Sequence, residues 1–319
     1  MDDQPETFSR RDFMRRTGSC GAHLLLAGAW LPASARRLFA ARPYGLVQAV
    51  EPWGRIEEVA EGVWAMVSTP LGGDFTTISN GGIIAGRDAV LAIEGLGSVD
   101  GARWLGDASE SLTGRRPTHV VLTHYHGDHS AGQAGYADGE GTLRVVATAE
   151  TQRLLESADG ERLLPNVILN AGERATEIDL GGRKVMITAR EGHTSSDVTV
   201  EIDDPRVVWC GDLVWNRMFP NYRDAKPSRL IRHVREVLSD SDALYVPGHG
   251  ALSDHAGLRP YIDMLEHVGE AAQAALDRGT RVEAAAAEYR VPESLGEWTM
   301  FSPRYYEVAF RAWASERDA

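Results

Sequence analysis

The stretch from Thr123 to His129 constrains this chain more than any other. It reads Thr-His-Tyr-His-Gly-Asp-His, so it places three of the chain's 10 histidines beside a carboxylate. Imidazole and carboxylate are the groups that a borderline cation such as Zn²⁺ selects. Chance rarely gathers them at such close spacing in a solvated polar loop. We therefore interpret the stretch as a cluster of metal ligands.

A short apolar run precedes this cluster directly. Residues 118–122 read Thr-His-Val-Val-Leu, which predicts a buried strand. His119 belongs to that strand, and we interpret it as structural. The histidine cluster then begins the loop at the carboxyl end of a strand, where α/β folds usually carry their sites.

Three further motifs each follow a predicted strand. Glu-Gly-His ends at His193, Cys-Gly-Asp ends at Asp212, and Pro-Gly-His ends at His249. The strands before them are predicted at 184–188, 206–210 and 243–246. A glycine beside each candidate ligand permits close backbone approach. We expect these three side chains to meet the histidine cluster at one rim of the fold.

The remaining pattern predicts a mixed α/β fold in one domain. Short strands fill 54–125, among them a strand at 76–78, and fill 174–250 again. Helical periodicity separates some of them and dominates from residue 257 onward. Two β-rich halves favour two sheets packed face to face with helices outside. Residues 36–53 show no clear period and are expected to form an N-terminal arm.

The first 35 residues resemble a twin-arginine export signal. Ser9-Arg10-Arg11-Asp12-Phe13 precedes an apolar stretch and a small-residue cleavage site at 33–35. The expected organisation is therefore a signal peptide over 1–35, the arm over 36–53, and one domain with a helical C-terminal segment over 54–319. An amphipathic N-terminal helix and an uncleaved anchor are the alternatives. The Gly, Ser, His and Pro content makes a poor membrane helix, so no permanent membrane anchor is expected.

These features predict where the protein acts and with what. The expected location is the periplasm or the exterior, and the expected partners are the twin-arginine export machinery and a small-molecule substrate. The formal net charge is −13 and only Lys184 and Lys226 are lysines, which argues against a nucleic-acid partner. Cys20 lies in the leader, so Cys210 would stand alone in the mature chain without a disulfide.

The order of the four motifs resembles that of the metallo-β-lactamase superfamily, over residues 54–255. The resemblance implies a four-layer αβ/βα sandwich, with two mixed β-sheets face to face and a dinuclear metal site along one edge. It assigns one metal to His124, His126 and His193. It assigns the other to Asp128, His129 and His249, and it makes Asp212 the bridge.

The resemblance also implies the chemistry. The ligand set suits two Zn²⁺ ions best, although Fe or Mn also occupy such nitrogen and oxygen sites. Two close dications lower the pKa of a shared water and produce hydroxide near neutral pH. Asp128 is the candidate catalytic residue, because its carboxylate can orient the hydroxide and take its proton.

Three positions leave alternatives open. The superfamily usually has Asp after the strand that ends at Ile93, but this chain has Glu94. Cys210 is a rival for Asp212, because residues i and i+2 of an extended segment share a face. Asp197 is either a support for a ligand or a turn residue.

Substrate specificity is less constrained. Trp215 stands where the best-known β-lactamases have a lysine for the substrate carboxylate, which leaves Asn216 or Arg217 as candidates for that role. C-terminal aromatic residues either pack over the sandwich or form an apolar substrate wall. They are Trp298, Phe301, Tyr305, Tyr306, Phe310 and Trp313.

The sequence therefore predicts an exported dinuclear-metal hydrolase. A metal-bridging hydroxide would attack an ester, lactone, thioester or β-lactam carbonyl. The alternatives are a non-catalytic metal-binding accessory protein of the periplasm, and a phosphodiesterase or sulfatase on the same fold.

Overall fold

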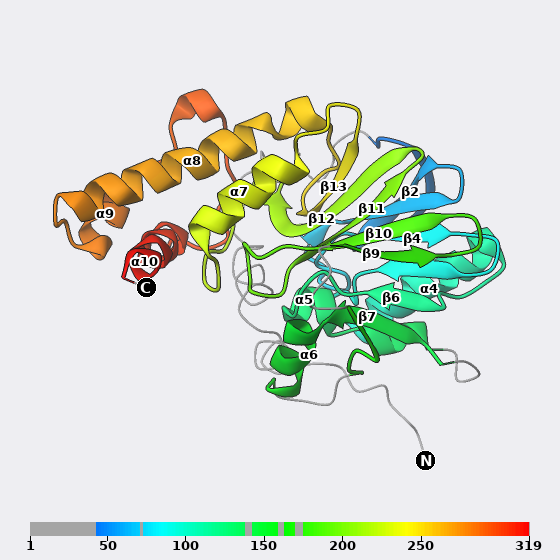
Figure 1. Cartoon of the computed structure of the whole chain (residues 1–319). Helices are drawn as coiled ribbons and strands as arrows, with labels where there is room; N and C mark the ends of the chain where they lie inside the picture. Colours follow the sequence, from blue (N-terminus) through cyan, green and yellow to red (C-terminus); the bar gives the residue numbers. More distant parts are fainter. Residues whose placement is uncertain (1–42, 71–72, 138–141, 159–162, 170–174, 319) are drawn as a thin grey trace, which may run out of the picture.

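The computed structural model describes residues 43–70, 73–137, 142–158, 163–169 and 175–318. Two β-sheets lie face to face and helices cover both outer sides (Figure 1). This arrangement confirms the predicted mixed α/β sandwich. The predicted signal peptide lies outside the described residues. Within the described ranges, every helix is too short or too polar to cross a membrane.

The first sheet has eight strands in sequence order. They are β1 (Leu46–Glu51), β2 (Gly54–Ala60), β3 (Val63–Ser68), β4 (Gly81–Ala85), β5 (Val90–Ile93), β6 (His119–Val121), β7 (Arg144–Thr148) and β8 (Val167–Leu169). Neighbours from β1 to β5 pair antiparallel, and those from β5 to β8 pair parallel. Parallel pairing needs crossover connections. Helices α4 (Val99–Thr113) and α6 (Ala149–Glu156) lie in two of them.

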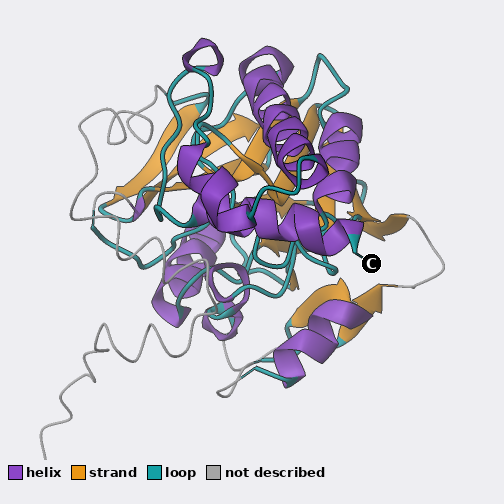
Figure 2. Ribbon diagram, turned by 90° about the vertical axis from the view of Figure 1, so that its left-hand side faces the viewer, coloured by secondary structure: helices purple, strands orange, loops and turns teal. Residues whose placement is uncertain are grey.

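The second sheet has five strands in the order β13-β12-β11-β10-β9. They are β9 (Ala175–Asp179), β10 (Lys184–Ala189), β11 (Val198–Asp203), β12 (Arg206–Trp215) and β13 (Leu244–His249). Only β12 and β13 pair parallel, and α7 (Pro227–Val237) connects them. Three more helices follow, namely α8 (His255–Asp277), α9 (Val282–Glu288) and α10 (Tyr305–Arg317). Figure 2 shows these helices and the two sheets from the side.

Strand β3 contributes side chains to two hydrophobic cores, one on each face of the first sheet. All its residues are buried. Val63 and its alternate neighbours pack between the sheets, whereas Trp64 and Met66 pack under α4. A strand that is buried on both faces needs a continuous apolar sequence, and Val-Trp-Ala-Met-Val supplies it. Trp209 joins the sheets, because its indole nitrogen donates to the Gly81 carbonyl at 3.0 Å.

The C-terminal aromatic residues pack over the outer face of the second sheet. Phe301, Tyr305, Phe310 and Trp313 are buried in the core that also contains α7 and α8. Trp298 and Tyr306 pack against the same core from its margin. Of the two alternatives for these side chains, the structure shows packing.

Two local expectations differ from the structure. Residues 46–51 of the expected arm form β1, which pairs antiparallel with β2. An edge strand has one neighbour and alternates weakly in burial, so its sequence carries little period. The strand predicted at 76–78 is a loop, and Ile78 has a left-handed φ of 66° that breaks extended structure.

Candidate metal centre

The seven predicted ligands meet at the edge where strands of both sheets end. His124 to His129 follow β6 and run into the short helix α5 (Gly127–Ser130). His193 follows β10. Asp212 lies within β12 and His249 ends β13, so both strands continue beyond the ends predicted for them. Each sheet thus contributes part of the site.

Two glycines make this convergence possible. Gly211 has a φ of 51°, and a Cβ on it would meet Thr123 Oγ1 at 2.7 Å. A Cβ on Gly248 would meet Asp212 Oδ1 at 2.2 Å. A larger residue at Gly211 would push β12 away from the loop that follows β6, and a larger residue at Gly248 would displace the Asp212 carboxylate.

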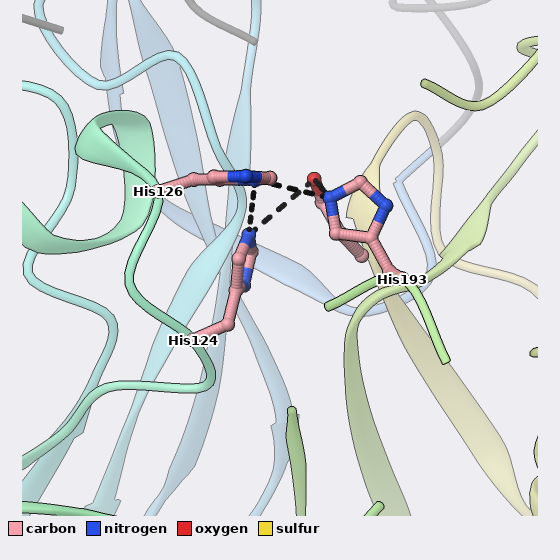
Figure 3. Close-up of side chains that lie close together, drawn as sticks. His124, His126 and His193 are labelled. Atoms are coloured by element: carbon pink, nitrogen blue, oxygen red, sulfur yellow. Dashed lines mark hydrogen bonds and ion pairs between the residues drawn. The ribbon is translucent and has the colours of Figure 1, made fainter. Parts of the chain in front are cut away.

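Three histidines and one carboxylate oxygen form the first cluster. Figure 3 shows the side chains of His124, His126 and His193 pointing toward one another. His126 Nδ1 lies 3.0 Å from His124 Nε2 and 3.1 Å from His193 Nε2. Asp212 Oδ2 completes the cluster at 3.3 Å from His193 Nε2. All four side chains are buried.

The second cluster lies on the other side of Asp212. Asp212 Oδ1 is 3.1 Å from His129 Nε2 and 3.2 Å from His249 Nε2. Asp128 Oδ2 lies 3.4 Å from His249 Nε2 and 3.6 Å from His129 Nε2. Within each cluster the candidate ligand atoms all lie within 4.8 Å of one another. Asp212 therefore turns one oxygen to each cluster, which is the arrangement of a bridging ligand.

The buried polar atoms of the second cluster fit a cation. Both oxygens of Asp128, both oxygens of Asp212 and the Nε2 atoms of His129 and His249 are buried without a hydrogen bond of acceptable geometry. Buried carboxylates without partners are costly. A divalent cation would satisfy these atoms at once, and imidazole with carboxylate is a donor set that Zn²⁺ accepts.

The two clusters differ in the direction in which their surroundings shift the pKa of a histidine. Burial lowers the pKa of His193 to about 4, and burial also holds the pKa of His124 well below its usual value. Burial also acts to lower the pKa of His249, but Asp212 and Asp128 outweigh it and raise that pKa to about 9. Without metal, the buried carboxylates thus favour the protonated forms of both His249 and His129. A bound dication would replace that positive charge.

Cys210 belongs to neither cluster. Its Sγ lies 3.7 Å from the Val208 carbonyl, in the core on the outer face of the second sheet. Gly211 has a left-handed backbone and the pairing of β12 with β13 shifts there, so Cys210 and Asp212 do not share a face. Burial raises the pKa of the Cys210 thiol. Cys210 is therefore a side chain of the core and not the alternative metal ligand to Asp212.

Glu94 supports ligands in both clusters. Its Oε1 lies 2.9 Å from His129 Nδ1 and accepts a hydrogen bond from Thr123 Oγ1 at 2.5 Å. Thr123 Oγ1 in turn lies 3.1 Å from His124 Nδ1. A carboxylate behind an imidazole fixes its orientation and its tautomer. The glutamate therefore fills the position where the superfamily usually has Asp.

Asp197 fixes the loop that carries His193. Its two oxygens accept hydrogen bonds from the Thr194 amide at 2.8 Å and from Thr194 Oγ1 at 2.5 Å. The side chain is buried, and burial raises its pKa to about 8. Asp197 is therefore both a turn residue and a support for a ligand, because the turn that it shapes carries the candidate ligand His193.

Asp224 is a residue of the site that the sequence did not reveal. It lies in the loop between β12 and α7, and its Oδ2 is 2.9 Å from His126 Nε2. Tyr125 donates its hydroxyl to the same oxygen at 2.9 Å. Burial acts to raise the pKa of Asp224, but hydrogen bonds from His126 and Tyr125 outweigh it and hold that pKa at about 2. No motif surrounds Asp224, and only the fold brings it to His126.

The candidates for carboxylate recognition are engaged elsewhere. Asn216 Nδ2 donates to the Ala251 carbonyl at 2.8 Å. Arg217 donates to the Leu295 carbonyl at 3.3 Å and lies over the Trp298 ring. Trp215 is fully buried, with its ring centroid 4.4 Å from that of His249. Trp215 thus packs against a candidate ligand.

The family profile described as the metallo-β-lactamase superfamily matches residues 75–299, which is most of the chain. The chain belongs to the metallo-β-lactamase superfamily. The match spans the β4 to β13 region and every residue of both clusters. Members of this superfamily use metal ions, so the two clusters are candidate metal sites and the protein is a candidate metallohydrolase.

Within the metallo-β-lactamase superfamily, the chain is similar in sequence to hydroxyacylglutathione hydrolases. It is 28% identical to that of Acidiphilium cryptum over 211 residues, which cover 66% of this chain and 76% of the relative. It is 30% identical to that of Methylococcus capsulatus over 112 residues, covering 34% of this chain and 40% of the relative.

Two solved structures share the fold. The sec-alkylsulfatase Pisa1 of Pseudomonas sp. has a TM-score of 0.66 at 16% identity, covering 94% of this chain and 62% of that one. The metallo-β-lactamase of Pontibacter korlensis has a TM-score of 0.56 at 18% identity, covering 67% of this chain and 99% of that one. The chain thus spans less than two thirds of the alkylsulfatase.

Proposed function

We propose that this member of the superfamily is an exported dinuclear metallohydrolase that cleaves an ester-type carbonyl compound. One observation carries the proposal. Asp212 presents its two oxygens to two separate buried clusters, and each cluster supplies three further donors from His and Asp. A protein that needed a single structural ion would have no use for the second buried cluster.

The seven candidate ligands would hold two ions, one in each cluster. His124, His126 and His193 would hold the first ion, and Asp128, His129 and His249 would hold the second, with Asp212 between them. Zn²⁺ suits this set best, and Fe or Mn are alternatives. When bound, the ions would polarise the scissile carbonyl and lower the pKa of water.

Asp128 is the proposed catalytic residue. Both of its oxygens are buried without a hydrogen bond of acceptable geometry, and Oδ2 is 3.4 Å from His249 Nε2. One oxygen can take part in holding the second ion while the other orients the attacking water and accepts its proton. Water adds to the carbonyl carbon as its proton passes to Asp128. The tetrahedral adduct then collapses, and the bond to the leaving oxygen, sulfur or nitrogen breaks as Asp128 returns that proton to the departing alcohol, thiol or amine.

A hydroxyacyl thioester is the first substrate class to test. The hydroxyacylglutathione hydrolases named above support it, because the similarity to that of Acidiphilium cryptum extends across 66% of this chain. Lactones and other esters share the same carbonyl chemistry. The buried Trp215 and the engaged Asn216 and Arg217 give less support to a β-lactam, because none of them offers a free cation to a carboxylate.

The decisive experiment combines metal analysis with a substrate panel. The purified protein is expected to hold two metal ions per chain and to hydrolyse one of a hydroxyacyl thioester, an aryl ester, a lactone or a cephalosporin. Asp128→Asn is the matched variant, and it should lose most turnover. Full metal loading without turnover would favour a non-catalytic accessory protein. Turnover of a phosphodiester or sulfate ester alone would replace the proposed reaction.

The proposal that the protein is exported rests on its leader sequence. Twin-arginine export would place the protein in the periplasm or outside the cell, with the export machinery as its partner. Changing both Arg10 and Arg11 to Lys should retain the protein in the cytoplasm, as cell fractionation would show. Unchanged export of that double variant would remove the twin-arginine assignment.

A further inference from the structure

The first cluster has one histidine whose outward nitrogen meets a carboxylate from a distant segment. His126 is 2% exposed, and its Nε2 lies 2.9 Å from Asp224 Oδ2. The two residues are separated by 98 positions in the chain. His126 comes from the loop after β6 of the first sheet, and Asp224 comes from the loop after β12 of the second.

His126 differs from the other histidines of its cluster in the atom it presents. His124 and His193 turn Nε2 toward the cluster, whereas His126 turns Nδ1. A neutral imidazole has one protonated nitrogen and one nitrogen with a free lone pair. If the proton sits on Nε2 and is donated to Asp224, the lone pair of Nδ1 faces the cluster. The carboxylate thus selects the tautomer that can bind a cation.

Tyr125 holds the carboxylate itself. Its hydroxyl donates to the same Oδ2 at 2.9 Å, and the Asp224 side chain is 35% exposed. A partly exposed carboxylate would otherwise sample several rotamers. The hydrogen bond from Tyr125 restrains Oδ2 in front of His126.

We propose that Asp224 is a positioning residue that fixes His126 with its Nδ1 turned toward the first cluster. The inference rests on the proposed function, because it concerns the same metal centre. It parallels the buried Glu94, whose Oε1 lies 2.9 Å from His129 Nδ1 on the other side of Asp212. Each cluster then has one histidine aligned by a carboxylate behind it, one at the interior and one at the surface.

Metal affinity tests this role without any substrate. Competition with a chromogenic chelator measures Zn²⁺ binding to the metal-free protein. Asp224→Ala should weaken binding at the first cluster by roughly 10-fold to 100-fold, as expected for loss of a carboxylate behind a ligand histidine. Asp224→Asn should lose less, because the amide oxygen can still accept from His126. Tyr125→Phe should have the smallest effect of the three.

Two backgrounds assign the effect to one cluster. His249→Ala leaves the first cluster intact, so Asp224→Ala should still weaken Zn²⁺ binding there. His193→Ala leaves the second cluster, and there Asp224→Ala should change nothing. Asp263→Ala is the matched control, because Asp263 is a similarly exposed carboxylate in an ion pair with Arg259 on α8.

The outcomes are separable from those of the proposed function. Unchanged Zn²⁺ affinity in Asp224→Ala would overturn the positioning role, even if the enzyme hydrolyses its substrate. Weakening in both backgrounds would also overturn it, because it would indicate a general structural defect. Conversely, a protein that binds two ions but hydrolyses no substrate would refute the proposed hydrolase activity. The chelator measurement would still decide the role of Asp224.

Discussion

Glu94 Oε1 lies 2.9 Å from His129 Nδ1, and both side chains are buried. Glu94→Gln keeps the size of the side chain but removes the charge that aligns His129. We expect the second cluster to bind Zn²⁺ roughly 10-fold to 100-fold more weakly, with a matching loss of turnover at limiting metal. Chelator competition measures this. Glu110→Gln on the exposed face of α4 is the control, and equal affinities in the two variants would contradict the prediction.

His126 and His129 belong to different clusters, so their removal should have different consequences. His126→Ala should lose mainly the first ion and His129→Ala mainly the second, because each cluster keeps its other donors. Elemental analysis after dialysis would give close to one ion per chain for both variants. Retention of both ions and of activity by either variant would show that the two-site division is wrong.

Asp212 is common to both clusters and should behave differently from either histidine. Asp212→Ala removes one donor from each cluster and leaves the protonated His249 without its main carboxylate partner. We expect this variant to bind both ions weakly and to show no measurable turnover. A variant that keeps one ion at wild-type affinity would mean that Asp212 does not bridge.

Metal removal should destabilise the folded chain. A ligand that binds only the folded state at about 1,000 times its dissociation constant adds about 4 kcal/mol to the free energy of unfolding. Urea unfolding with and without a chelator would measure the loss for this protein. Asp212→Ala should respond little to the chelator, so an equal response in that variant would indicate a cause outside the two clusters.

Cys210 should be chemically silent in the folded protein. It is fully buried, and burial raises its thiol pKa, so little thiolate is present at neutral pH. A thiol reagent should label Cys210 only after denaturation. Peptide mapping separates this signal from any labelling of Cys20. Rapid labelling of Cys210 in the native protein would place it near an opening to solvent.

The sequence predicted the sandwich and the convergence of seven side chains for a clear physical reason. Histidines and carboxylates beside glycines at strand ends are visible as motifs, and strand ends of packed sheets meet at one edge. Even so, Asp212 lies inside β12, because the kink at Gly211 lets the strand continue past the candidate ligand.

The parts that escaped prediction depend on contacts between distant segments. Asp224 lies in a loop without a recognisable motif, and its role follows only from its place beside Tyr125 and His126. Strand β1 was missed because an edge strand leaves a faint pattern. Ile78 looked like part of a strand, but its buried side chain sits on a left-handed backbone that no local sequence rule indicates.

The division of the ligands between the two sheets sets an order of assembly. Asp212 belongs to both clusters, and His249 belongs to the second, so neither cluster is complete in a chain that ends before β12. A nascent chain therefore cannot select its metal early. If the protein crosses the membrane already folded, the composition of the cytoplasmic metal pool, and not that of the destination, decides which ions it carries.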